Sequence, residues 1–153
     1  MKSLTLPFLI LSVASAHAFA DNELVKTQSH SDVSSTASRL VTLLENKGMT
    51  IFATIDHSDA ANKIGATLRP TQLVIFGNPK IGSKLMQCQQ SIGIDLPQKM
   101  LISEDQDGKV WISYNQPHYL AQRHHLSGCD NVLKKVETAL NNFAKKAAQT
   151  NNP

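Results

Sequence analysis

The sequence predicts an α+β domain with an antiparallel or mixed sheet and its helices on one face. Apolar stretches with strand character alternate with amphipathic helical segments in the order β-α-β-β-α-β-β-α. Short connections, among them a hairpin signal at Asp107-Gly108, favour antiparallel pairing. A parallel dinucleotide-binding sheet would need a G-x-G-x-x-G turn after its first strand, and that motif is absent.

Residues 1–20 are predicted to be a signal peptide that is cleaved from the mature protein. Lys2 gives a positive start, and Ala18-Phe19-Ala20 has the small-x-small pattern of a cleavage site. The apolar stretch between them is too short for a permanent membrane span. We therefore expect residues 21–150 to form a single domain in the periplasm or secreted medium, without membrane contact after cleavage.

The composition of the mature chain excludes one large class of function. Cleavage leaves 133 of the 153 residues and lowers the formal charge from +3 to +2, because Lys2 is lost. A nucleic-acid-binding domain is expected to concentrate basic residues on one face, and so weak a positive balance does not indicate one. The length suits one domain with a substantial core.

The first half of the chain is expected to alternate strand and helix. Residues 23–30 and 49–57 have strand character, and Asp32 is a favourable N-cap for the helix between them. Gly48 supplies its left-handed stop. The helical spacing is carried by Val33, Ala37, Leu40, Val41 and Leu44. Residues 59–68 suit a short helix or turn that ends before Arg69-Pro70.

Residues 71–77 are nearly all apolar, which predicts a central strand. Asn78 is a favoured N-cap and Pro79 suits the first helical position. One helical face is then formed by Ile81, Leu85, Cys88 and Ile92. The loop Gly77–Gly82 that joins this strand to this helix is interpreted mainly as a helix start. Its amide groups also allow an anion site, although Pro79 removes one of them.

The second half ends with a hairpin and a long helix. Residues 99–105 and 109–115 are predicted strands, joined at Asp107-Gly108 by a type I′ turn with positive φ at both residues. Asp130 is expected to cap the last helix. Its apolar face consists of Leu133, Val136, Leu140 and Phe143 or Ala144.

Cys88 and Cys129 leave three interpretations open. In an oxidising compartment an even number of cysteines favours one disulfide, here between two helices. Each could instead be a small buried apolar residue. Alternatively, both could join His124 and His125 around zinc or copper, but no pair has the spacing that makes a zinc site convincing.

Catalytic residues are not assigned from the sequence. His57 follows Asp56 and His124 follows Arg123, yet neighbours on a strand point to opposite faces. A dyad is more plausible between segments, for example Asp56 with His124. No G-x-S-x-G elbow exposes a serine. An enzyme is thus less favoured than a binding protein, and no cofactor is predicted.

The stretch from about residue 50 to 126 closely resembles the bacterial and archaeal family known as domain of unknown function 302. The resemblance is carried by Asp56-His57, Arg69-Pro70, the loop Gly77–Gly82, Leu85-Met86, Asp95-Leu96-Pro97, Tyr114-Asn115 and Arg123-His124. It implies a curved antiparallel sheet against helices, similar to the TATA-binding-protein fold, and a homodimer. It implies no activity. His125 stands where a Gly is usual, and the cysteine pair departs from the family pattern.

The same motifs suggest a pocket with a polar mouth, because several of them fall at predicted strand ends. Its walls would be Phe76, Met86 and Trp111. The candidate ligand-binding residues are Asp56, His57, Asn78, Met86, Tyr114, Asn115, Arg123 and His124. An Arg123–Asp56 ion pair with Tyr114 in the core is the structural alternative.

The sequence therefore predicts a periplasmic or secreted homodimeric domain that binds a small molecule or an anion. A metal or thiol-redox protein using Cys88, Cys129, His124 and His57 is the second hypothesis.

Overall fold

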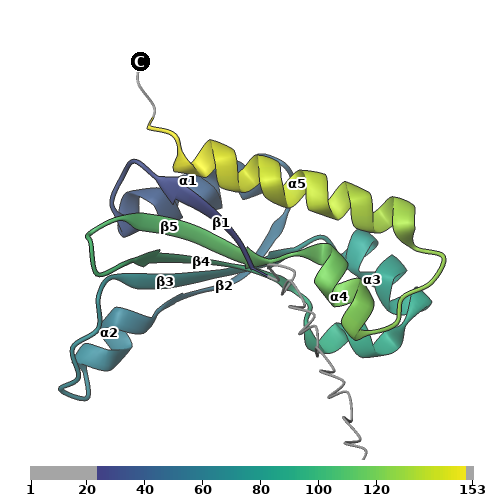
Figure 1. The fold of residues 1–153 in the computed structure, drawn as a ribbon, viewed down its shortest axis with the longest axis horizontal. Coiled ribbons are helices and arrows are strands. Elements are labelled where there is room, and N and C mark those ends of the chain that lie inside the picture. The colour runs from purple at the N-terminus through teal and green to yellow at the C-terminus, as the bar shows by residue number, and fades with distance from the viewer. Residues whose placement is uncertain (1–23, 151–153) are drawn as a thin grey trace, which may run out of the picture.

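The computed structural model describes residues 24–150 and has the predicted α+β architecture (Figure 1). Its single sheet has five strands in the order β1-β5-β4-β3-β2, and every neighbouring pair is antiparallel. The strands are β1 (Leu24–Ser29), β2 (Thr50–Asp56), β3 (Thr71–Gly77), β4 (Gln98–Glu104) and β5 (Val110–Asn115). The predicted signal peptide lies outside the described residues.

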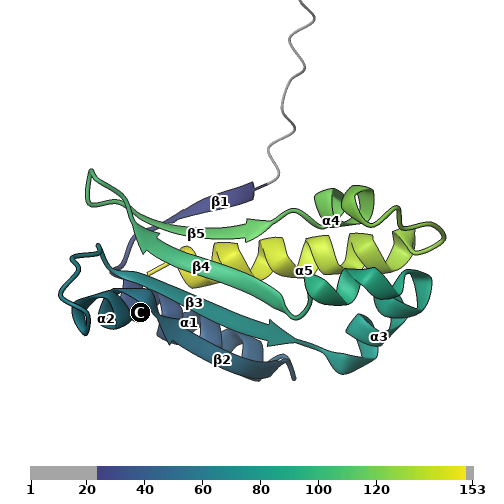
Figure 2. The same cartoon turned by 90° about the horizontal axis from the view of Figure 1, so that it is seen from below.

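Two long helices cover one face of the sheet. These are α1 (Val33–Glu45) and α5 (Asp130–Ala148), which lie behind the strands in Figure 2. Shorter helices extend from the two ends of the sheet: α2 (His57–Asn62) at one end, and α3 (Pro79–Cys88), the 3-10 helix η1 (Gln90–Ile94) and α4 (Pro117–Arg123) at the other. Within residues 24–150, none of the helices has the length and apolar character needed to cross a membrane.

Alternation along the strands builds the main core between the sheet and the two long helices. Phe76, Met100 and Ile112 are fully buried on the helix-facing side, where they meet Leu40 of α1 and Leu140 of α5. Each such side chain contributes about 1.5–3 kcal/mol by its burial. A second cluster, made of Leu85, Ile92, Leu120 and Cys129, joins α3, η1, α4 and the start of α5. This second cluster holds these helices together at the end of the sheet where β3 enters α3.

The boundaries of α1 agree with the expected capping residues. Asp32 Oδ1 accepts a hydrogen bond of 2.8 Å from the Ser35 amide. Gly48 has φ +67°, the left-handed conformation predicted for a helix stop. Local side-chain chemistry therefore determined both ends of this helix.

Three predicted details are wrong. The helix α3 ends at Cys88, so Ile92 reaches the second core cluster from the separate turn η1. Residues 117–123, not predicted as a helix, form α4, with Pro117 at its start. The last helix begins at Asp130 and its capping position is Cys129.

The β4–β5 hairpin also differs from the predicted two-residue turn. Residues 105–109 form a five-residue connection between strands that end at Glu104 and begin at Val110. Asp105 organises this loop, because its Oδ1 accepts from the amides of Asp107 and Lys109 at 2.9 Å each. Gly108 has φ +73°, whereas Asp107 is not in the positive-φ region. These hydrogen bonds to the Asp105 carboxylate stabilise a longer loop, which does not need the positive φ at two residues that a type I′ turn requires.

Candidate functional site

A pocket of about 470 Å³ lies where α3 and η1 face α5, next to the start of β2, the end of β3 and the start of β4. Most of its lining is apolar. The lining residues are Met49, Phe52, Phe76, Gly77, Asn78, Pro79, Ile81, Gly82, Ser83, Leu85, Met86, Gly93, Leu96, Pro97, Gln98, Lys135, Val136, Ala139, Leu140 and Phe143. Its volume lies within the range of about 300–1,000 Å³ that is usual for small-molecule sites.

The loop Gly77–Gly82 forms one side of this pocket and also starts α3. Asn78 Oδ1 accepts a hydrogen bond of 3.0 Å from the Lys80 amide, and Pro79 occupies the first helical turn, as predicted. The amides of Ile81 and Gly82 both donate to the Asn78 carbonyl at 2.9 Å. Since these donors are already used, the loop is a capped helix start that borders a pocket, and not an open anion cradle.

Gly82 lines the pocket, and the packing around it does not require a glycine at this position. A Cβ atom placed there would come no closer than 3.9 Å to Leu96 Cδ1, an ordinary contact. Glycine inside a helix costs about 1 kcal/mol relative to alanine. The missing side chain therefore enlarges the pocket at an expense to helix stability. Gly93 differs, because its Cβ would lie 3.3 Å from Met86 Sδ and the methionine would have to move.

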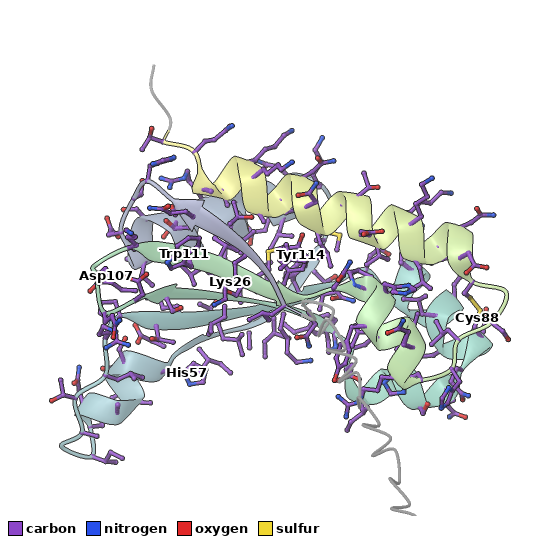
Figure 3. The ribbon with its side chains drawn as sticks, viewed as in Figure 1. Lys26, His57, Cys88, Asp107, Trp111 and Tyr114 are labelled. Carbon is purple, nitrogen blue, oxygen red and sulfur yellow. A yellow bond between two sulfur atoms is a disulfide. The ribbon has the colours of Figure 1, made fainter. Side chains whose placement is uncertain are left out.

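The Cys88–Cys129 disulfide, the favoured interpretation of the two cysteines, is present in the structure. Figure 3 shows it beneath the start of α5, where it links the last residue of α3 to the residue before α5. Cys129 is buried, whereas Cys88 is exposed and not on the buried face of its helix as expected. The bond holds together the two helices that form opposite walls of the pocket.

Charge at the pocket is carried by a single lining residue, Lys135. It is exposed on α5. Asn78, Ser83 and Gln98 are the other polar lining residues, and the lining contains no carboxylate. An apolar cavity with a cationic edge is thus the main feature of this end of the molecule.

Of the residues predicted to surround a ligand, Asn78, Met86 and the wall residue Phe76 line the pocket. Asp56 and His57 do not, because they lie at the other end of the sheet where α2 begins (Figure 3). His57 is exposed there. The expectation that the predicted residues gather around one cavity is therefore wrong for this pair.

Asp56 caps α2. Its carboxylate accepts from Ser58 Oγ at 2.6 Å, from the Asp59 amide at 2.8 Å and from Gln72 Nε2 at 3.0 Å. These hydrogen bonds, that from Ser58 above all, lower the pKa of the Asp56 carboxyl. The Asp56-His57 motif is therefore explained as the start of α2, with Asp56 as its N-cap.

The β5 residues also lie away from the pocket. Tyr114 is a buried member of the main core, as the structural alternative stated, and burial raises the pKa of its hydroxyl. Asn115 is exposed at the end of β5, opposite Leu24. Trp111 alternates with the buried Ile112 and so faces away from the core. Its indole donates to Asp105 Oδ2 at 2.8 Å, so it supports the hairpin and is no wall of the pocket.

Arg123 and His124 meet Asp95, a residue that sequence reasoning did not select. His124 Nε2 lies 2.6 Å from Asp95 Oδ2 and Arg123 Nη1 lies 3.4 Å from Asp95 Oδ1. His124 Nδ1 lies 3.0 Å from Ser91 Oγ. This polar cluster ties the end of α4 to η1 and replaces the expected pairing with Asp56. The Asp95-Leu96-Pro97 motif could have drawn attention to Asp95, but nothing in the sequence indicated that it lies next to His124.

The predicted metal or thiol-redox alternative loses its two thiols in this structure, because the sulfur atoms are bonded to each other. Among residues 24–150, no group of three or more His, Cys, Asp or Glu side chains is arranged to hold a metal ion. His57 is also remote from Cys88, as Figure 3 shows.

Fold and pocket together define a small α+β domain with an apolar cavity beneath its C-terminal helix. The family model of the "Domain of unknown function DUF302" matches residues 25–143, and the chain belongs to this family. The solved structure of an uncharacterised DUF302 protein from Bacillus stearothermophilus has the same fold, with a TM-score of 0.75 and 15% identity. The similarity covers 83% of this chain and 98% of that one.

Three curated relatives from Brucella species are 41% identical over 129 residues, which is 84% of this chain. The relatives from Brucella suis and Brucella abortus are named "Fluoride-specific ion channel FluC 1", and that from Brucella melitensis "Fluoride-specific ion channel FluC 2". The chain spans about half the length of these relatives: 51% of the first and 48% of the other two.

Proposed function

We propose that this protein is a periplasmic or secreted binding domain that holds one small, mainly apolar molecule in the pocket between α3 and α5. The observation that carries this proposal is the pocket of about 470 Å³ with its apolar lining. Most small-molecule sites combine such a lining with a few polar groups that orient the ligand. Export rests on the signal peptide predicted for residues 1–20.

Two features indicate that the pocket is a ligand site and not a defect in the packing of the helices. Gly82 leaves space that a larger residue could fill without backbone strain. The disulfide fixes the end of α3 against the start of α5, so the two walls are held in one relative position by a covalent bond. Preorganised walls lower the conformational cost of binding.

The experiment is a titration with N-phenyl-1-naphthylamine, a neutral apolar dye whose fluorescence rises in an apolar site. We expect saturable binding of one dye per chain. Gly82→Leu should place a branched side chain in the pocket and weaken binding, whereas Gly82→Ala is the matched control that adds one methyl group and should bind nearly as well as the wild type. Circular dichroism checks that both variants are folded. Absence of saturable binding, or equal binding by Gly82→Leu, would contradict the proposal.

A second candidate role comes from the relatives named as fluoride-specific ion channels. Since those proteins contain a segment 41% identical to this chain within a polypeptide of about twice the matched length, we propose that this chain acts beside a fluoride channel. The test is growth on fluoride of a host strain that lacks the protein, with wild-type and Gly82→Leu genes restored. Unchanged fluoride tolerance in the deletion strain would reject this role.

We also propose a homodimer, which rests on the family resemblance. Sedimentation equilibrium of the mature chain measures the assembly directly. A mass that stays at one chain across the concentration range would refute it.

A further inference from the structure

We infer that the ligand of this pocket is an amphiphile whose apolar body lies in the cavity and whose carboxylate, or a comparable anionic group, lies at Lys135. This inference rests on the proposed binding function and adds the chemical class of the ligand.

The first argument is the sign of the charge at the pocket. Lys135 is the one titratable residue among those that line it, and the lining contains no carboxylate. An anionic end group beside an ammonium is attracted, whereas a ligand ammonium in the same place is repelled and lacks a counter-charge. Lys135 is exposed, so the anionic group would remain close to water and avoid the high cost of burying a charge.

The second argument is the hydrogen-bonding character of the polar lining. An ammonium can only donate. Asn78 uses its side-chain oxygen to accept from the Lys80 amide, which leaves its NH2 group as the available donor. An ionised carboxylate is an acceptor only, and so it matches these donors better than an amine does.

The neighbouring lysine provides an internal control for this inference. Lys134 is also exposed on α5 but does not line the pocket. It carries the same charge on the same turn of the helix, and therefore separates an effect at the pocket from a general effect of net charge. The chain thus supplies its own control.

The experiment compares dodecanoate, dodecanol and dodecylammonium as competitors of N-phenyl-1-naphthylamine, near neutral pH and at low ionic strength. The three share one hydrocarbon chain and differ in the end group. We expect dodecanoate to bind about two- to fivefold more tightly than dodecanol, the size of an exposed ion pair. Dodecylammonium should bind most weakly. Added salt should reduce the difference between dodecanoate and dodecanol, because it screens the pair.

The variant Lys135→Gln should bring dodecanoate and dodecanol to nearly equal affinity, while Lys134→Gln should keep the wild-type order. If all three competitors bind the wild type equally, or if Lys134→Gln and Lys135→Gln have the same effect, the ligand class is wrong although the binding function stands. If none of the three displaces the dye and the dye itself does not bind, the binding function fails with it.

Discussion

The disulfide between Cys88 and Cys129 joins the two helices that form opposite walls of the pocket, α3 and α5. The two Cα atoms are 6.5 Å apart and the residues are separated by 41 positions in the sequence. Without the bond, the contact between α3 and α5 would depend on the second core cluster, to which Leu85 and Cys129 belong. Stability and pocket shape are therefore linked at this point.

Removal of this disulfide should lower the free energy of unfolding by about 4 kcal/mol, because a loop of this length no longer restrains the unfolded chain. Urea denaturation of a Cys88→Ala/Cys129→Ala double variant measures the effect. Reduced wild-type protein should resemble the double variant. A double variant as stable as the oxidised protein would show that the bond does not contribute.

The Asp95–His124 contact should be a second stabilising link at the same end of the molecule. Asp95→Ala leaves Nε2 of the buried His124 imidazole without its partner, and we expect a loss of about 1–3 kcal/mol. Chemical denaturation of Asp95→Ala, His124→Ala and the double variant gives the coupling energy of the pair. Asp107→Ala, in the exposed hairpin loop, should change stability by less than about 0.5 kcal/mol. Additive losses in the double variant would show that the two residues act separately.

Stability should depend on the Asp105 carboxylate at acid pH. Hydrogen bonds from the Trp111 indole and then from the Lys109 amide lower the pKa of the Asp105 carboxyl from its ordinary value of 3.8. A carboxyl with a lowered pKa in the folded state stabilises the protein above its unfolded pKa, and this contribution is lost as the pH falls through the folded pKa. The free energy of unfolding of Asp105→Asn should therefore decrease less than that of the wild type as the pH falls below about 4. Urea denaturation between pH 2 and 6 measures it, with Asp107→Asn as the control. Parallel pH profiles for wild type and Asp105→Asn would contradict the prediction.

His125→Gly should stabilise the protein. His125 has φ +51°, and it stands where the family resemblance places a glycine. A side chain in the left-handed region costs about 1–2 kcal/mol, part of which glycine loses again through its greater freedom in the unfolded chain. We expect a net gain of about 0.5–1 kcal/mol in thermal or urea denaturation. His125→Ala keeps the Cβ atom and should give no such gain. Equal stability of the two variants would show that the backbone there is not strained.

The sequence by itself determined the fold class and the ends of those elements that a nearby side chain sets. Asp32 and Gly48 bound α1, and Asn78 with Pro79 starts α3, because each of these effects needs only a side chain and the nearest turn of backbone. The apolar spacing of α5 likewise predicted which side of this helix faces the core, and the apolar run of β3 predicted a strand in the interior of the sheet. The cysteine pair was found because an oxidising compartment favours a bond between two such residues.

Only the tertiary structure decided which residues share a site. The strand ends that carry Asp56 and Tyr114 look equivalent in the sequence to the end of β3, yet antiparallel pairing places the end of β2 far from the α3 end of the sheet. Asp95 contacts His124, and Lys135 and Asn78 line the same pocket, although in each case the two residues lie far apart in the chain. Such contacts depend on how whole helices pack against the sheet, so they cannot be predicted from the spacing of residues along the sequence.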